Sequence, residues 1–447
     1  MSAFGKDYSG RKSLSVLKRR LLVDGMPIVV DLAKSKGAYL YNQLDKKTYL
    51  DFYSFFASLA IGFTHPGLKK KSYLKALHEA AGVKPALSDI YSPHFAHFVD
   101  IFDKICLRGM FRYLFFIEGG ALAVENALKV AFDWKSRLNL KHGSKTEANQ
   151  VIHFSQCFHG RSGYTLSMTD TFDKRKTDYF PKFPWPRVLN PKIHVYEEDA
   201  LPPTLEGRER TALSQIEAHL NQFGAETAAI IIEPVQSEGG GNYFRPEFFR
   251  ALRRVADDRD VLLIFDEVQT GMGISGKWWC WEHYGVKPDL MAFGKKAQVS
   301  GIAVTDRIDR EKIDHCFKIP SRINSTFGGN LCDMVRATRY IEIIQEENLL
   351  KNMAASGKQI LKALEKLAEK YPMANVRGLG GLIAFDVPTV EIRNRIVKTA
   401  LEKERLLILP SGKRSVRLRP TLSITKKEAE DGIARLDKTL WRIFSNG

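Results

Sequence analysis

Apolar residues in the middle of the chain come in short continuous runs that are separated by longer amphipathic segments. The runs that predict strands span residues 113–117, 151–154, 228–232, 261–265 and 290–293. They are continuous rather than alternating, which is typical of strands that helices bury on both faces. The segments 121–138 and 246–255 carry apolar residues on one stripe and predict helices. The alternation over residues 113–304 predicts an α/β unit with a mostly parallel sheet.

The pattern changes after residue 333. Residues 334–346 and 356–371 predict amphipathic helices, and residues 382–387 and 416–419 predict strands, so this part reads as a smaller α+β unit. A chain of 447 residues also exceeds the size at which a single core stops growing. We therefore expect three parts, which are an N-terminal segment that packs with the small domain, a large domain and a small C-terminal domain, at residues 1–75, 76–332 and 333–447.

Two predicted strands of the large domain deliver titratable side chains from their carboxyl ends. Asp266 follows one apolar run directly, and Lys295 follows the next run after a single glycine. Because ligands bind beyond the carboxyl ends of parallel strands, we expect both side chains at one site. Pyridoxal phosphate needs such a pair, an amine that holds its aldehyde as a Schiff base and a carboxylate that keeps its pyridine nitrogen protonated. The pattern therefore indicates a pyridoxal phosphate site.

Lys295 has two competing interpretations. Most lysines lie on the surface, and Lys296 is the nearest rival for the cofactor role. However, a lysine at the end of an apolar segment is costly without a purpose. Burial lowers the pKa of a lysine and suits it to Schiff-base chemistry, which favours Lys295.

Two turns near these strands carry further candidates. Gly119-Gly120-Ala121 lies between a predicted strand and a predicted helix, where small residues let backbone N–H groups approach a phosphate. Phe158 follows the next strand and could stack on a pyridine ring, and Arg161 could hold a carboxylate with two hydrogen bonds. Taken alone, the two glycines are better read as a plain turn, and Phe158 and Arg161 are equally well read as a packed aromatic and a surface arginine.

Asp266 also has a reading as the magnesium-binding acid of a P-loop NTPase. The segment 271–277 fits the spacing G-x-x-x-x-G-K. Two features exclude it. Trp278 stands where the metal needs a hydroxyl, and the segment lies in the same connection as the acid, so it has no strand and helix of its own.

Composition narrows the class of protein. Hydrophobic residues make up 44% and charged residues 27% of the chain, which are ordinary globular values. The net charge of +17 comes from basic residues that are spread along the chain, so it favours a solvated surface over nucleic-acid binding. No apolar run is long enough for a membrane span. The five scattered cysteines and the absence of an apolar signal segment favour a cytoplasmic protein with reduced thiols. The basic, serine-containing N-terminal segment leaves an organellar transit peptide as the alternative.

Several segments together resemble the class III (ω-)aminotransferases, which are pyridoxal phosphate enzymes of fold type I. The resemblance runs from about residue 22 to 422 and is carried by FIEGGALAVENALKVAFDWKSR, FHGRSGYTLSMTDT, IIEPVQSEGG, LLIFDEVQTGMG, AFGKK, INSTFGGN and VRLRPTL. Within the class, GGALAVENAL, HGRSGYTLS and FGKK resemble the subgroup that acts on L-lysine. The resemblance implies a large, mostly parallel sheet of the seven-stranded type, a smaller α+β domain, and a homodimer with shared active sites.

The resemblance also implies the residues that bind pyridoxal 5′-phosphate. Lys295 would form the internal aldimine and move the proton, and Asp266 would pair with the pyridine nitrogen. The remaining contacts would be with the ring oxygen (Gln269), the ring face (Phe158), the phosphate (backbone of Gly120 and Ala121) and the neighbouring subunit's phosphate (Thr326).

Three further positions would bind the substrates. Arg161 and Arg417 would hold substrate carboxylates. Glu238 would pair with Arg417 while the amino donor is bound and swing aside for the second carboxylate of 2-oxoglutarate. Neutralising Arg417 blocks the wrong binding mode, so the distal amine of lysine reaches the cofactor.

The resemblance thus implies transfer of the ε-amino group of L-lysine to 2-oxoglutarate, giving glutamate and 2-aminoadipate 6-semialdehyde, which cyclises. Another ω-amino acid, such as 4-aminobutyrate or ornithine, is the alternative donor. A pyridoxal phosphate-binding regulator without turnover is the alternative from another class. We expect small-molecule substrates, and neither a metal ion, nor nucleic acid, nor a membrane as a partner.

Overall fold

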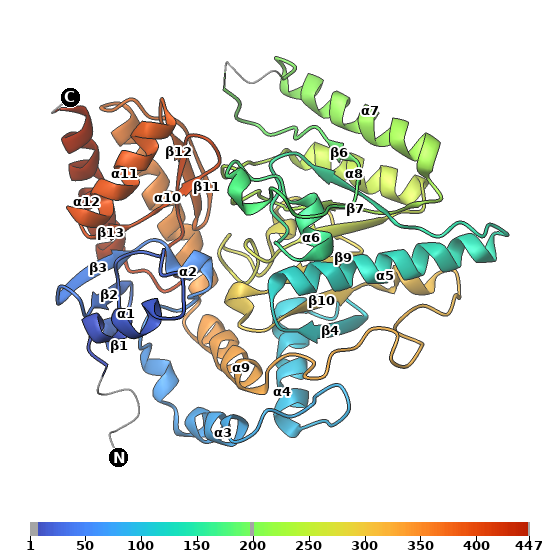
Figure 1. Cartoon of the computed structure of the whole chain (residues 1–447), viewed down its shortest axis with the longest axis horizontal. Coiled ribbons are helices and arrows are strands. Elements are labelled where there is room, and N and C mark those ends of the chain that lie inside the picture. The colour runs from blue at the N-terminus through green and yellow to red at the C-terminus, as the bar shows by residue number, and fades with distance from the viewer. Residues whose placement is uncertain (1–7, 197–200, 446–447) are drawn as a thin grey trace.

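The computed structural model describes residues 8–196 and 201–445. Its largest element is a seven-stranded sheet in the order β4-β10-β9-β8-β7-β5-β6 (Figure 1). The strands are β4 (Tyr113–Ile117), β5 (Gln150–Phe154), β6 (Arg187–Val188), β7 (Thr227–Ile232), β8 (Leu262–Asp266), β9 (Leu290–Phe293) and β10 (Ser300–Val304). Only β10 runs antiparallel to its neighbours β4 and β9. The expected mostly parallel sheet is therefore confirmed.

Helices cover both faces of this sheet. Helix α5 (Gly120–Lys141) packs on one face, and α7 (Leu205–Phe223) and α8 (Pro246–Asp258) lie on the other. Successive residues of β8 point to opposite faces of the sheet. Ile264 belongs to the core on the side of α5, and Phe265 packs on Phe249 of α8 with ring centroids 5.4 Å apart. Both faces are buried, which explains why the strand sequences are continuously apolar.

Two smaller four-stranded sheets are built from the ends of the chain. One joins β1 (Val30–Lys36), β2 (Tyr39–Asn42) and β3 (Lys47–Asp51) to β13 (Leu406–Leu407), which pairs parallel with β3. The other has the order β11-β12-β15-β14, with bounds Ala374–Leu379, Leu382–Asp386, Ser415–Leu418 and Leu409–Ser411. The N-terminal strands thus pack with the C-terminal part of the chain (Figure 1). The boundaries at residues 75 and 332 stay a prediction.

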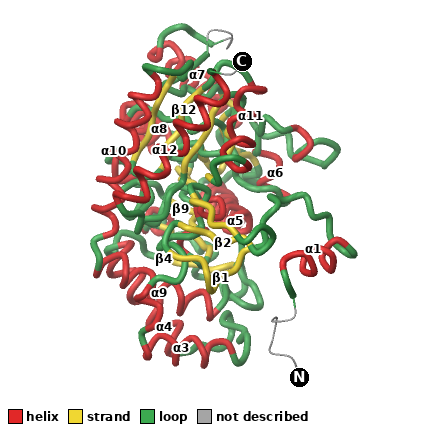
Figure 2. Tube along the Cα trace, turned by 90° about the vertical axis from the view of Figure 1, so that its left-hand side faces the viewer, coloured by secondary structure: helices red, strands yellow, loops and turns green. Residues whose placement is uncertain are grey.

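The remaining helices surround these sheets. They are α1 (Gly10–Lys18), the left-handed turn α2 (Ser54–Ala57), α3 (Lys71–Ala81), α4 (Pro93–Ile101), α6 (Gly163–Met168), α9 (Leu331–Glu346), α10 (Leu349–Ala368), α11 (Val390–Glu402) and α12 (Lys426–Phe444). Figure 2 shows α3, α4 and α9 gathered at one end of the molecule, where α9 contacts both of the others. Helix α10 begins earlier than residue 356, the predicted start, because Asn348 adopts a left-handed conformation (φ 53°) immediately before it.

Candidate active site

The turns that follow β4, β8 and β9 meet at one edge of the large sheet. A Cβ atom added to Gly120, after β4, would lie 2.8 Å from Cγ1 of Val268, after β8. A Cβ atom added to Gly294, after β9, would lie 3.6 Å from the Cα atom of Gly120. A side chain at Gly120 would hold the turns after β4 and β8 apart, so this glycine allows their close approach, and the turn after β9 lies at ordinary van der Waals distance from Gly120. The structure therefore brings the turns that carry Asp266 and Lys295 together, as the sequence predicts.

Lys295 opens a short 3-10 turn (Lys295–Ala297) directly after Gly294, with a positive φ of 50°. The pKa of Lys295 is lowered to about 8, chiefly by burial and also by the charge of Arg417, while the charges of Asp266 and Glu233 oppose this. A lysine with such a pKa carries a substantial fraction of neutral, nucleophilic amine near neutral pH. Lys296 differs, because it is fully buried and its Nζ has no hydrogen-bond partner among the described residues.

Asp266 ends β8 and is held by two donors. Nδ1 of His159 lies 2.8 Å from its Oδ2, and the backbone N–H of Val268 donates to its Oδ1 at 3.0 Å. Both Asp266 and His159 are buried. An ionised carboxylate accepts up to about four hydrogen bonds, so Asp266 keeps acceptor capacity for a pyridinium N–H. Sequence reasoning missed His159, although it stands inside the FHGR segment that it did select.

Glu233 is a second residue that sequence reasoning missed. It follows β7 directly and accepts hydrogen bonds from the backbone N–H groups of Phe158, at 2.8 Å, and Ser237, at 3.2 Å. Burial raises the pKa of Glu233 well above its usual value, and the charge of Asp266 adds to this. Glu233 therefore holds the loop that carries Phe158 in place. The ring of Phe158 is half-buried, and the sequence resemblance predicts that it stacks on the face of the cofactor ring. An acid that ends an apolar run, as in IIEP, was the available signal.

The N-terminus of α5 fits an anionic group. Its N-cap is Gly119, which makes no side-chain cap, and the first turn contains no acidic residue. Its N–H groups and dipole are thus available to a phosphate, as predicted for Gly120 and Ala121. Gly160 presses on this turn from the next loop: a Cβ atom there would lie 2.6 Å from Cβ of Ala121, and its φ is +132°. The predicted phosphate site at this helix N-terminus is therefore shaped by glycines, which have no side chains to fill it.

Arg417 lies in β15 and is fully buried, and one of its N–H groups donates from Nη1 to the carbonyl oxygen of Ser237 at 3.1 Å. Burial lowers the pKa of Arg417, and the charge of Glu238 is the largest opposing influence. However, the two side chains make no direct ion pair among the described residues. Glu238 instead accepts hydrogen bonds from Lys176 and Thr171, both at 2.8 Å. The expected Glu238–Arg417 pair is thus not the state of this structure.

The other predicted residues are placed less tightly. Gln269 is half-buried in the turn after β8, next to Val268. Arg161 and Thr326 are exposed, and within the described residues neither makes a hydrogen bond or ion pair with Lys295. Their assigned roles stay predictions, and exposure of Thr326 leaves it accessible to a second subunit.

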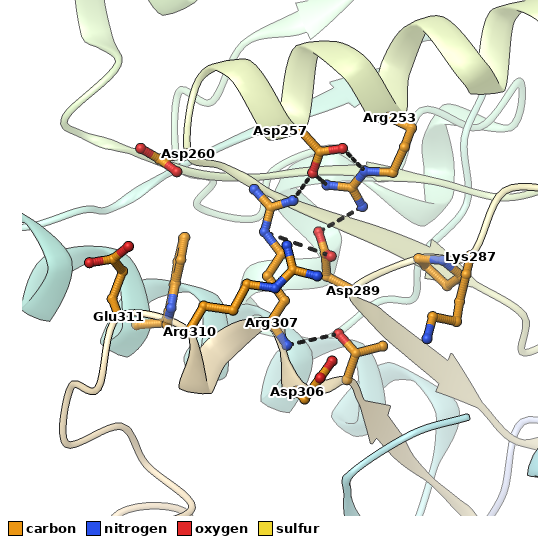
Figure 3. A pocket seen from close by; sticks show the side chains of 12 residues that line it. Arg253, Asp257, Asp260, Lys287, Asp289, Asp306, Arg307, Arg310 and Glu311 are labelled. Carbon is orange, nitrogen blue, oxygen red and sulfur yellow. Dashed lines mark hydrogen bonds and ion pairs between the residues drawn. The ribbon is translucent and has the colours of Figure 1, made fainter. Parts of the chain in front are cut away.

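A separate cavity of about 340 Å³ lies at the opposite edge of the sheet (Figure 3). Asp289 lines it and directly precedes β9, whose other end leads to Lys295. Four of its charged side chains are paired: Arg253 pairs with Asp257 at 2.7 Å and with Asp289 at 2.9 Å, and Arg307 also pairs with Asp257. These four side chains form an ion-pair network between α8, the residue before β9 and the turn after β10.

No group of three His, Cys, Asp or Glu residues that could hold a metal ion occurs among the described residues. Within the same residues, no helix has the length and apolar character needed to cross a membrane. All five cysteines lie in the described ranges and are free.

Known proteins share both the sequence and the fold. A family model described as "Aminotransferase class-III" matches residues 22–440. The chain is 43% identical over 429 residues to "L-lysine-epsilon aminotransferase" of Mycobacterium tuberculosis, covering 95% of this chain and 94% of that protein. It is 40% identical over 430 residues to the protein of that name from Streptomyces clavuligerus, with 96% and 93% covered. The solved structure "Lysine aminotransferase from M. tuberculosis in the internal aldimine form" matches with a TM-score of 0.93 and 42% identity, covering 98% of this chain and 100% of that one.

Proposed function

Because the chain belongs to the class III aminotransferases, we propose that it transfers the ε-amino group of L-lysine to 2-oxoglutarate. The products are glutamate and 2-aminoadipate 6-semialdehyde, which cyclises. Relatives named for this activity, 40–43% identical over nearly the whole chain, support lysine as the donor. The observation that carries the chemistry is the convergence of a low-pKa amine, Lys295, and a buried carboxylate, Asp266, beside an uncapped helix N-terminus.

The enzyme uses pyridoxal 5′-phosphate, which supplies an electron sink when it is bound. Lys295 would hold its aldehyde carbon, and the N-terminus of α5 would hold its phosphate. Asp266 would keep the pyridine nitrogen protonated, and His159 would orient Asp266 by donating from Nδ1. Lys295 would also accept and return the proton at the substrate carbon that carries the amine.

Regiochemistry follows from where the carboxylate of lysine is bound. We infer that Arg161 holds it and that Glu238 neutralises Arg417 during the first half-reaction, so the distal amine faces Lys295. In the second half-reaction Glu238 releases Arg417 to the second carboxylate of 2-oxoglutarate. The backbone places Glu238 beside Arg417, because Arg417 donates to the carbonyl oxygen of the preceding residue, Ser237, at 3.1 Å, and this supports an exchange between the two.

We also propose a homodimer with shared active sites. The support is the exposure of Thr326 and Arg161, two residues with assigned ligands that lie on the surface of the single chain. Sedimentation of the cofactor-loaded enzyme tests this directly, since a stable monomer with full activity contradicts it.

The test of the donor and its regiochemistry uses isotopic nitrogen. Lysine that carries ¹⁵N at the ε position should give ¹⁵N-glutamate, and lysine labelled at the α position should give unlabelled glutamate. The Lys295→Ala variant is the control and should form no glutamate. Label arriving from the α position overturns the proposed regiochemistry, and activity in the Lys295→Ala variant overturns the assignment of the lysine.

Two alternatives are separated by simple measurements. Initial rates with 4-aminobutyrate and ornithine, under one acceptor, should fall well below the rate with L-lysine if the donor is assigned correctly. A binding protein without turnover would show no glutamate with any donor. Tight, sequence-specific nucleic-acid binding at physiological salt would favour that alternative, because non-specific basic binding fades there.

A further inference from the structure

We propose that Lys176, together with Thr171, is the second partner of Glu238 and sets how easily Arg417 becomes free for 2-oxoglutarate. This inference rests on the proposed function, because it assumes that 2-oxoglutarate needs Arg417. Lys176 would be a positioning residue that acts through Glu238 and touches neither substrate.

The contacts define a specific holding site for one carboxylate oxygen. Nζ of Lys176 and Oγ1 of Thr171 each lie 2.8 Å from Oε1 of Glu238. The other oxygen, Oε2, is buried and has no hydrogen-bond partner among the described residues. The Lys176 and Glu238 side chains are 33% and 16% exposed, so the pair lies at the mouth of the site rather than in open solvent. Glu238 is thus held at one oxygen only.

The backbone around Glu238 is fixed, which leaves its side chain as the moving part. The carbonyl oxygen of Glu238 accepts from the backbone N–H of Gly412 at 2.8 Å and from Oγ of Ser411 at 3.1 Å. The preceding carbonyl, of Ser237, accepts from Arg417 at 3.1 Å. These contacts tie the segment to the sheet that carries Arg417. Rotation of the Glu238 side chain therefore exchanges Lys176 for Arg417 without a backbone rearrangement.

Lys176 and Arg417 compete for the carboxylate of Glu238, so moving that carboxylate from one cation to the other costs little free energy. Without Lys176, Glu238 would stay paired with Arg417, because leaving Arg417 would leave the charge of Glu238 uncompensated in a buried site. With Lys176 present, Glu238 keeps an ion pair in either position. The free-energy difference between the two positions is then small, and a substrate carboxylate at Arg417 can shift it. Lys176 thereby favours the arrangement that accepts 2-oxoglutarate.

The experiment compares Lys176→Met with Lys174→Met under both substrates. Lys174 lies on the same turn (Lys174–Lys176) and pairs with Asp170 at 3.0 Å, so its removal changes local charge without touching Glu238. Lys176→Met should raise KM for 2-oxoglutarate about two- to fivefold, which is the effect expected from losing a partly exposed ion pair. The value of kcat should not change, and KM for lysine should stay the same or fall. Lys176→Arg should restore the original value, and Lys174→Met should leave it unchanged.

A double variant separates the proposed route from a plain charge effect. In a Glu238→Ala background, Lys176→Met should no longer change KM for 2-oxoglutarate, because its partner is gone. A rise that persists in that background, or an equal rise in Lys174→Met, overturns the inference. An unchanged KM in Lys176→Met also overturns it, while turnover of lysine in the same variant leaves the proposed function standing.

Discussion

The pKa of Lys295 gives a quantitative prediction for the protein without its cofactor. Because burial lowers this pKa to about 8, the fraction of neutral amine should rise through pH 8 rather than near the usual value of 10.5. At pH 7, about one tenth of Lys295 should be neutral, against about one in three thousand for an ordinary lysine. The neutral amine is the nucleophile, so cofactor capture at pH 7 should be faster by about two orders of magnitude than for a free lysine of equal intrinsic reactivity.

The assay measures the initial rate at which apoprotein captures added pyridoxal 5′-phosphate between pH 6 and 10, followed by absorbance. The same rates with Nα-acetyl-lysine amide serve as reference, because the ratio cancels the ionisations of the cofactor itself. Lys295→Ala apoprotein corrects for other lysines. Asp266→Asn should move the midpoint to lower pH, since the charge of Asp266 raises the pKa of Lys295. A midpoint near 10.5, or a rate ratio that does not depend on pH, refutes the reasoning.

Three further predictions follow from single contacts. Asp266→Asn should lower kcat with L-lysine by about a hundredfold or more, measured in single turnovers, because the ring nitrogen loses its anionic partner; a change below threefold contradicts the role. Gly160→Ala should weaken cofactor affinity about tenfold or more in a fluorescence titration, because its Cβ would lie 2.6 Å from Ala121, whereas Gly163→Ala meets only an ordinary contact at 3.6 Å and should bind normally. Lys296→Met should leave Tm unchanged or raise it, because the substitution removes a buried amine that has no hydrogen-bond partner among the described residues. A fall in Tm of more than about 5 °C would show that the Lys296 amine does have a stabilising partner.

The sequence predicted the parts of the site that local patterns encode. Asp266 and Lys295 stand at the ends of continuous apolar runs, and a run of that kind is a strand whose end faces the ligand edge. Gly119 and Gly120, at the start of α5, likewise predict a strand-to-helix turn. These features depend on neighbours in the sequence, so a pattern is enough to find them.

The parts that sequence reasoning missed depend on contacts between distant segments. His159 pairs with Asp266 across 107 positions of the chain, and no local pattern shows that partnership. Lys176 reaches Glu238 from a loop 62 positions earlier, and it takes the place that the resemblance assigns to Arg417. Which of two cations holds a carboxylate depends on side-chain geometry, which only the folded chain provides.

The most direct test of the account locates the lysine that holds the cofactor. The purified, cofactor-loaded enzyme is reduced with borohydride, digested and mapped by mass spectrometry. We expect a pyridoxyl label on Lys295 alone, with Lys296 unlabelled. A label on Lys296 or on any other lysine, or no label at all, contradicts it.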